Sequence, residues 1–257
     1  MGQPGSAKRG RYHHGDLAAA LVDAAIEVIG ERGVHGFSMA ESSRRLGVAV
    51  SAPYAHFADR NDLLAAVAVR AYQRFYAAVA PDTDPGLAPA DRLAAMARGY
   101  VRFAASDRPL FQVLYEAGLD KTGHPEIEAA EQPINDAFMA CVDALSGGSG
   151  PAAGELASAL EATAHGHAML LLDSGQPPPA GEVERTAERA ARATRALIES
   201  RGLLSGAAGP ADCDRPGVSP HGLWRAAGPQ THPSHRAPAD GANRAMALGD
   251  GGLLGTG

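Results

Sequence analysis

The stretch FSMAESSRRLGVAVSAPYAHF, residues 37–57, holds two short helical signals on either side of a glycine. Ser38 with Glu41 three residues later forms a capping box, in which the hydroxyl accepts a backbone N–H and the carboxylate reaches back. The helix that starts there is expected to run for roughly two turns and to end at Gly47. A second short helix is expected to follow the glycine.

Pro53 decides where this second helix begins. Proline has no N–H and clashes inside a helix, but the first helical turn needs no internal donor. The helix is therefore expected to start near residues 49–51 and to end near residues 57–58, with its N-terminal residues facing outward. Two helices joined by a tight turn at Gly47 form a helix-turn-helix, whose second helix enters the major groove of DNA.

Helical patterns continue on both sides of this pair. Asp16 and Gly33 bound a first helix, and Asp59 caps a longer helix that is expected to end at Pro81. Because the chain is rich in Ala and Arg and poor in aromatic and β-branched residues, we expect an all-α fold. Beyond a Pro- and Gly-containing loop, further helices are expected over residues 89–105, 108–118, 125–146, 154–173 and 182–201.

Charge and cysteine content narrow the function classes. The first 60 residues hold seven Lys or Arg and six Asp or Glu, whereas the whole chain carries −6, which suits a nucleic-acid-facing N-terminal part. Two distant cysteines, Cys141 and Cys213, favour a reducing cytoplasm over a disulfide framework. The start has no apolar signal segment, and the longest apolar run, near residues 168–172, is too short to span a bilayer. No membrane association is expected.

The segments YHHGDLAAALVDAAIEVIGERG and FSMAESSRRLGVAVSAPYAHFADRNDLL resemble the N-terminal DNA-binding region of tetracycline-repressor (TetR) family regulators. The resemblance covers Tyr12 to Leu64. Its opening YHHGDL is typical of one branch, whose C-terminal ligand domain often contains a Trp and a His-Gly pair. The most specific matches are Gly47, Val48, Tyr54, His56, Phe57, Leu63 and Leu64.

The resemblance implies contacts with double-stranded DNA. Val50, suited to a thymine methyl, and Ser51 would face bases, while Tyr54 and His56 would contact phosphates. Arginines in the N-terminal arm would reach an adjacent minor groove. The residues expected to contact DNA are Arg9, Arg11, Ser38, Arg44, Arg45, Val50, Ser51, Ala52, Tyr54, His56 and Arg60. A core position is favoured for Phe57, and Arg44 and Arg45 have at most phosphate roles.

This chain departs from the family pattern at several positions. Ala49 stands where a Ser or Thr cap is common, and Ala55 where many members carry a bulky or basic residue. Both indicate modest phosphate contact and a sparse reading of bases. In the C-terminal half the Trp of the branch is replaced by Glu161, which is placed to pair with His165 one helical turn later.

A homodimer is implied for the C-terminal domain. The segments 154–173 and 182–201 would form a four-helix bundle with a second subunit, and the operator would be roughly palindromic. The close-packing stripe expected on the first segment consists of Leu156, Leu160, Ala164, Ala168, Leu171 and Leu172. The stripe on the second consists of Val183, Ala187, Ala190, Thr194, Leu197 and Ile198.

The same domain is expected to bind an apolar or amphipathic small-molecule effector, without any cofactor. Candidate pocket residues are Met96, Tyr100, Phe103, Phe111, Tyr115, Phe138, His165 and Met169. Such residues at helical spacing are more often core than pocket, and the sequence leaves both interpretations open. His165 is favoured as a structural histidine, and because His167 lies on another face, a helical metal site is disfavoured.

These expectations combine into a ligand-responsive repressor that is released from its operator when the effector shifts the connecting helix. The expected domains are a basic arm (1–13), a helix-turn-helix domain with connecting helix (14–80), a ligand-binding and dimerisation domain (86–202) and a disordered tail (203–257).

Three alternatives remain. A nonspecific architectural DNA binder would need more positive charge. A metal-responsive regulator would use the tail histidines His221, His232 and His235, which lack ordered partners at fixed spacing. An enzyme is disfavoured: Lys121-Thr122-Gly123 echoes a motif of penicillin-binding serine enzymes, but the companion motifs are missing.

Overall fold

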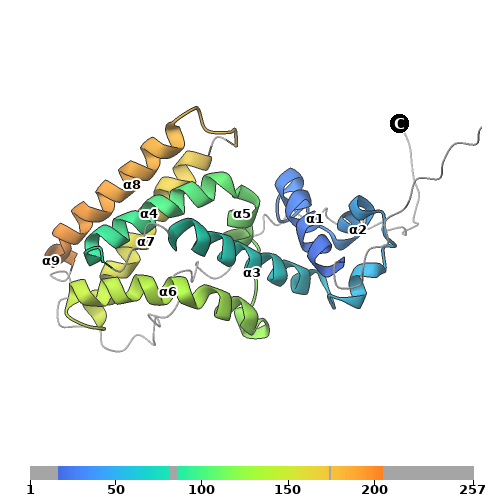
Figure 1. The fold of residues 1–257 in the computed structure, drawn as a ribbon, viewed down its shortest axis with the longest axis horizontal. Helices are drawn as coiled ribbons and strands as arrows, with labels where there is room; N and C mark the ends of the chain where they lie inside the picture. Colours follow the sequence, from blue (N-terminus) through green and yellow to red (C-terminus); the bar gives the residue numbers. More distant parts are fainter. Residues whose placement is uncertain (1–16, 81–85, 174, 205–257) are drawn as a thin grey trace, which may run out of the picture. The chain divides into compact units, whose positions relative to one another are not determined.

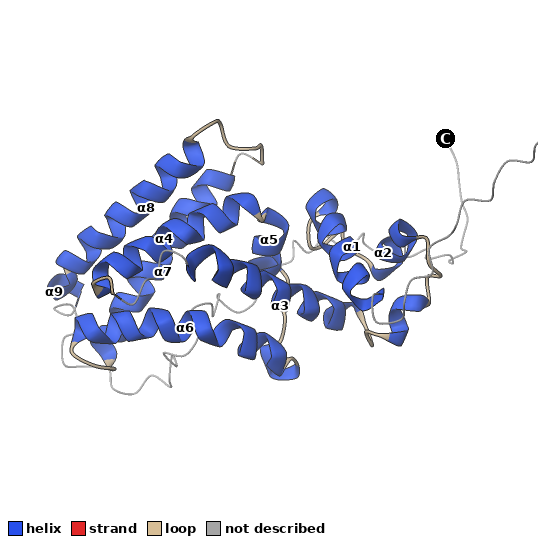
Figure 2. Cartoon of the chain, in the orientation of Figure 1, coloured by secondary structure: helices blue, strands red, loops and turns tan. Residues whose placement is uncertain are grey.

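The structure is a computed structural model that describes residues 17–80, 86–173 and 175–204. All regular structure in these ranges is helical, as Figure 2 shows, so the all-α expectation is confirmed. The 3-10 helices are η1 (Ala52–Ala55) and η3 (Lys121–Gly123). The α-helices are α1 (Leu17–Arg32), α2 (Met39–Leu46), α3 (Arg60–Val79), α4 (Pro89–Ser106), α5 (Arg108–Glu116), α6 (Pro125–Ser146), α7 (Pro151–Leu172), α8 (Glu182–Glu199) and α9 (Arg201–Leu204).

Some expectations fall outside the described residues. These are the basic arm 1–13, the Asp16 cap, most of the loop after α3, and residues 205–257 of the expected tail. Residues 203–204, which were also expected in the tail, belong to the short helix α9.

The caps of α2 form largely as the sequence predicts. The Glu41 N–H donates to the Ser38 hydroxyl at 3.3 Å, and Gly47 ends the helix with a φ of 67°, a left-handed conformation that glycine adopts without steric cost. The second half of the capping box does not form. The Glu41 carboxylate pairs instead with the guanidinium groups of Arg32 and Arg44, because two cations attract a carboxylate more strongly than one backbone N–H.

The helix after Gly47 is shorter than expected and is not an α-helix. Residues 50–51 form a turn, and only Ala52–Ala55 make one turn of 3-10 helix, η1. Pro53 has no N–H with which to bond the carbonyl of Ala49, so the tighter pattern takes over, as in the 2.9 Å bond from the Ala52 N–H to the Ala49 carbonyl.

Helix α3 links the N-terminal helices to the remaining ones. Asp59 caps it by accepting hydrogen bonds from the N–H groups of Asn61 and Asp62 at 2.7 and 3.0 Å, as predicted. Its apolar face contacts α1 near its start and α4, α5 and α6 further along, so α3 passes from one group of helices into the other (Figure 1). Near its end, a Cβ added to Gly99 of α4 would lie 2.8 Å from Val79 Cγ1, so α3 and α4 pack unusually closely.

Helices α4 to α8 form a bundle with α4 packed against α3, α6, α7 and α8. The observed helices agree with the expected ranges to within a few residues; α7 starts at Pro151, three residues early, because proline is favourable in a first helical turn. None of the described helices is both long enough and apolar enough to cross a membrane.

The small-residue stripes of α7 and α8 are placed differently from the expectation. Leu156, Leu160 and Ala168 of α7 are buried within the subunit, as are Ala187 and Ala190 of α8. These two faces therefore pack α7 and α8 against each other and against α4 rather than against a second chain. Apolar residues at helical spacing identify the face of a helix that will be buried, but they do not tell whether a helix of the same chain or of a second subunit covers it.

Candidate DNA-contact surface and effector cavity

The segment after Gly47 presents large side chains to solvent. Val50 is 53% exposed and Tyr54 is 59% exposed, and both are among the few large hydrophobic side chains that the described residues leave uncovered. Ser51 and His56 are also exposed, and Ala52 is half-buried. Four of the predicted DNA-contact positions are thus accessible to solvent within seven residues of the chain, and Ala52 among them is partly accessible.

Two residues of the same segment anchor it. Pro53 is buried, and Phe57 is half-buried against the main core, which agrees with the core position favoured for Phe57. The Phe57 N–H donates to the Pro53 carbonyl at 2.9 Å, which closes the end of η1. The exposed side chains therefore project from a backbone that is fixed on its inner side.

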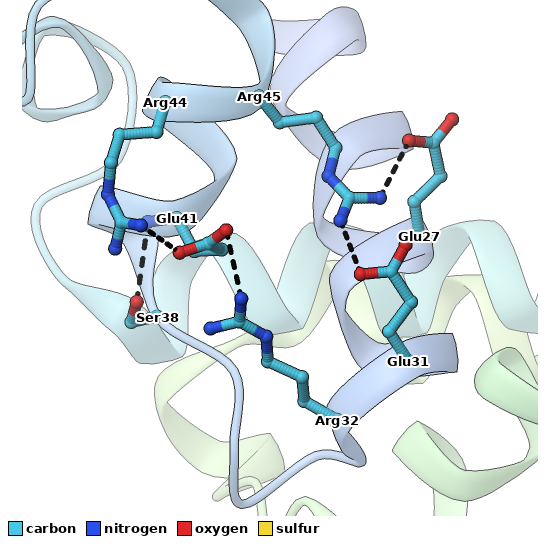
Figure 3. A network of polar contacts seen from close by, with 7 residues as sticks. All are labelled: Glu27, Glu31, Arg32, Ser38, Glu41, Arg44 and Arg45. Carbon is cyan, nitrogen blue, oxygen red and sulfur yellow. Dashed lines mark hydrogen bonds and ion pairs between the residues drawn. The ribbon is translucent and has the colours of Figure 1, made fainter.

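Arg44 and Arg45 both take part in ion pairs (Figure 3). Arg44 pairs with Glu41 of its own helix, whereas Arg45 bridges to Glu27 and Glu31 of α1 at 3.1 and 2.5 Å. The Arg45 guanidinium holds the pKa of the Glu31 carboxyl below its usual value through a hydrogen bond. Arg45 thus fixes α2 on α1, a positioning role that the sequence did not indicate.

Arg60 occupies the first position of α3 and faces the α1–α2 connection. Its guanidinium donates to the carbonyls of Val34 at 2.7 Å and of Phe37 at 3.3 Å, and it lies 5.6 Å from the centre of the Phe37 ring. A phosphate contact by Arg60 stays a prediction, and these bonds would compete with it. Ser38 is exposed at the tip of the same connection, while Arg9 and Arg11 lie outside the described residues.

A cavity of about 40 Å³ lies among helices α3, α4, α6, α7 and α8. Three of the predicted pocket residues, Met96, Tyr100 and Phe138, line it. Phe103 and Phe111 are core residues beside it, and Met169 is 45% exposed on the outside of α7. The full lining consists of Phe75, Leu93, Met96, Ala97, Tyr100, Ile134, Phe138, Leu160, Glu161, Ala164 and Thr194.

Comparison with known families gives two separate matches along the chain. A family model described as "Bacterial regulatory proteins, tetR family" matches residues 21–67, and one described as "Tetracyclin repressor-like, C-terminal domain" matches residues 93–194. Together the two ranges span more than half of the chain. The chain belongs to the TetR family. Its N-terminal helix-turn-helix is the DNA-binding part, and its C-terminal helices correspond to the family's ligand-binding domain.

Solved structures share the TetR fold. A protein with unknown function from Rhodococcus sp. RHA1 is 29% identical, with a TM-score of 0.57 over 72% of this chain and 96% of that one. AibR, in complex with isovaleryl coenzyme A and operator DNA, is 20% identical, with a TM-score of 0.53 over 68% of this chain and 95% of that one. A comparison with curated proteins gives no match.

In this TetR chain, His165 belongs to an aromatic cluster beside the cavity. Its Nδ1 lies 2.8 Å from the Tyr100 hydroxyl, which in turn lies 2.6 Å from the Tyr115 hydroxyl. Burial lowers the pKa of His165 and raises the pKa of both tyrosines, so all three groups are neutral at pH 7. The partner of His165 is therefore Tyr100 on α4, rather than Glu161 on its own helix.

Two polar cavity residues were not among the predicted pocket residues. Glu161 and Thr194 both line the cavity, and burial raises the pKa of the Glu161 carboxyl to about 8. The replacement of the branch's Trp by Glu161 was the one sequence signal at this place. Thr194 was assigned to the interface stripe, and no pattern marked it as a pocket residue.

A half-buried ion pair joins Lys121 to Glu131 on α6. The Lys121 ammonium contacts Glu131, whose side chain is 7% exposed, and lies 3.3 Å from the Tyr72 hydroxyl. The Lys-Thr-Gly sequence thus serves to place one cation between α3 and α6. Within the described ranges, no group of three or more His, Cys, Asp or Glu side chains is arranged to hold a metal ion; His221, His232 and His235 lie outside them.

Proposed function

We propose that this TetR family protein is a sequence-specific transcriptional repressor that binds a palindromic operator as a dimer and is released by a small molecule. The observation that carries the proposal is the exposure of Val50 and Tyr54 on a segment anchored by Pro53 between two capped helices. Large side chains held in water by an anchored backbone are available to contact base edges and phosphates.

Each exposed side chain suits a particular DNA group. Val50 offers methyl groups to a thymine methyl, and Ser51 can donate to or accept from a base edge. The hydroxyl of Tyr54 and the ring of His56 reach phosphates, as does the Ser38 hydroxyl, whose proton is not used in capping α2. Ala52 adds van der Waals contact. Arg44 and Arg45 contribute positive potential while they keep their ion pairs.

Because the expected stripes are buried within the subunit, we place the proposed dimer interface on the outer face of α7 instead. Leu170 is 80% exposed and Met169 is 45% exposed there, and the exposed Ala162 precedes them with no charged residue between. An uncharged face ending in two large apolar side chains is suited to a second copy of the chain. We call residues 50–56, which carry the exposed side chains in and around η1, the reading segment. Two subunits related by a twofold axis would place two reading segments on a palindromic site.

The effector proposal rests on the continuity of α3. Phe75 of this helix forms part of the cavity wall, and Arg60 at its other end holds the α1–α2 connection. A molecule that enlarges the cavity would displace α3 and alter the separation of the two reading segments. The corresponding domains are residues 14–80 and 86–202, and the site of action is the cytoplasm. Catalysis is no part of the proposal.

The test is binding of the dimer to DNA from upstream of its own gene, followed by fluorescence anisotropy at two salt concentrations with scrambled competitor. Tyr54→Ala is expected to abolish competitor-resistant binding, whereas Tyr76→Ala, which removes another exposed tyrosine from the outside of α3, leaves it unchanged. Binding that scrambled DNA competes equally, or equal loss in both variants, would contradict a sequence-specific regulator. The first of these results would favour the nonspecific architectural binder.

A further inference from the structure

Glu161 stands in the cavity wall without a counterion. Within the described part of the chain, no hydrogen bond or ion pair reaches its carboxylate. Thr194 lies in the same wall, is 2% exposed, and its hydroxyl is buried without a hydrogen-bond partner. Buried polar groups are normally paired, so the unpaired Thr194 hydroxyl marks a place where a ligand supplies the missing partner, and the half-buried Glu161 lies in the same cavity wall.

The charges around the cavity are not balanced. Glu161 and Glu131 repel each other, and Lys121 is the cation that pairs with Glu131. One oxygen of Glu131 remains buried without a partner even so. Lys121 pairs with Glu131, and no cation among the described residues pairs with Glu161, so a positive charge beside Glu161 would be favourable when its carboxyl group is ionised.

The remaining walls also favour a cation. Phe75, Tyr100 and Phe138 contribute aromatic rings to the lining, and the negative face of an aromatic ring attracts an ammonium group. The other lining side chains are aliphatic, so the molecule that fits must be apolar apart from its charge. An anion would meet an uncompensated carboxylate here.

We infer that the cavity takes a small apolar amine in its ammonium form, whose charge lies against Glu161 and whose N–H group donates to the Thr194 hydroxyl. The inference rests on the proposed function, in which this cavity is the effector site. It names the chemical class of that effector.

The titration of Glu161 supports the assignment. Burial raises the pKa of this carboxyl to about 8, and the charge of Glu131 on α6 adds to the effect. The other titratable groups facing it are Tyr100, Tyr115 and His165, which burial keeps neutral at pH 7. An ammonium ion binds the ionised carboxylate, so its affinity should rise by about tenfold per pH unit below pH 8 and then level off.

The size of the cavity ties binding to movement. A volume of about 40 Å³ has room for about three water molecules, at 10–15 Å³ for each. An amine carrying even one ring must therefore push the walls apart, and Phe75 of α3 is one of those walls. Binding of such an amine would therefore displace Phe75, and with it the helix α3 that leads to the DNA-binding part.

The test uses benzylamine, benzyl alcohol and benzoate, which share a ring and differ in charge. Calorimetric titration of the full chain at pH 8 is expected to give benzylamine an affinity at least about tenfold above that of either other probe. Glu161→Gln should remove that preference, and Thr194→Val should weaken it. Glu155→Gln, which removes an exposed carboxylate from the same helix, should leave it unchanged.

Several results would overturn the inference: equal binding of the alcohol, tighter binding of benzoate, no binding of any probe to the folded wild type, or a benzylamine preference that survives Glu161→Gln. Operator binding by the same preparation, measured without probes, separates this inference from the proposed function. A protein that binds its operator but does not prefer the amine would retain its function with another ligand class.

Discussion

Arg60 and Phe75 lie on one uninterrupted helix, about 22 Å apart at 1.5 Å of rise per residue. The guanidinium of Arg60 donates to the carbonyls of Val34 and Phe37 in the α1–α2 connection, while the ring of Phe75 forms part of the cavity wall. A packed α-helix moves as a stiff rod over such a length. The two ends of α3 therefore cannot shift independently.

Replacing Arg60 separates a structural role from a phosphate contact. Arg60→Met keeps the length of the side chain but loses both hydrogen bonds to the α1–α2 connection. We expect the free energy of unfolding to fall by about 1–2 kcal/mol, measured by urea denaturation. Operator affinity should fall with it, because the connection carries Ser38 and precedes the reading segment.

The salt dependence of operator binding distinguishes the two roles of Arg60. A pure phosphate contact would leave stability unchanged and lower the slope of log affinity against log salt by about one. Arg74→Met on the same helix is the matched control, because Arg74 is exposed and makes no such bonds. Unchanged stability in Arg60→Met would argue against the positioning role.

Gly99→Ala should disturb the contact between α3 and α4. The added Cβ would lie 2.8 Å from Val79 Cγ1 and 3.1 Å from the Ala78 carbonyl oxygen, and the backbone atom cannot move aside. We expect a loss of about 1–3 kcal/mol in thermal or urea unfolding. Gly154→Ala, on α7 with open space around it, should be neutral or slightly stabilising. Equal behaviour of the two variants would contradict the close approach.

Glu161 should make the stability of the protein depend on pH. Its pKa rises from 4.5 to about 8 on folding, so between these values the folded state holds a proton that the unfolded state has lost. The contribution of this group therefore declines as the pH rises from about 5 to 8. In Glu161→Gln this decline should vanish, giving a gain over the wild type of roughly 2–4 kcal/mol at pH 8 relative to pH 5. Parallel pH profiles of the two proteins would refute it.

Lys121→Met should lower the free energy of unfolding, because it leaves the buried Glu131 carboxylate without its counterion. Glu131 would then lack its counterion between α3 and α6, and we expect a loss of about 1–3 kcal/mol in urea unfolding, less than for a fully buried pair because Lys121 is partly exposed. Adding Glu131→Gln to this variant should recover much of the loss. If the double variant is no more stable than the single one, the ion pair is not the cause.

Local signals explain what the sequence predicts well. Ser38, Gly47 and Asp59 act on backbone groups within four residues, so their capping roles can be identified without knowledge of the fold. The exposure of Val50 and Tyr54 follows from the position of Pro53. The all-α fold followed from the composition and the helical patterns, whereas the residues assigned to DNA followed from the resemblance to the TetR family.

The features that the sequence did not reveal depend on distant partners. The cavity draws its lining from five helices, so no local pattern placed Thr194 in it, and the departure of Glu161 from the family's Trp did not say what the side chain faces. Arg60 resembles a surface cation until the carbonyls of Val34 and Phe37 are seen beside it. Similarly, the stripes on α7 and α8 predict burial correctly but not the chain that buries them.

The brevity of η1 limits how much information one subunit reads. A single 3-10 turn with the two residues before it spans about three or four base pairs of the major groove. A sequence of four base pairs recurs on the order of once in a few hundred base pairs of random DNA, and thus throughout any chromosome. Two such short sequences at a fixed spacing are far rarer, because the probabilities of finding each one at random are multiplied. In the proposed dimer, the distance between the two reading segments therefore contributes to sequence specificity, because it fixes the spacing of the two half-sites.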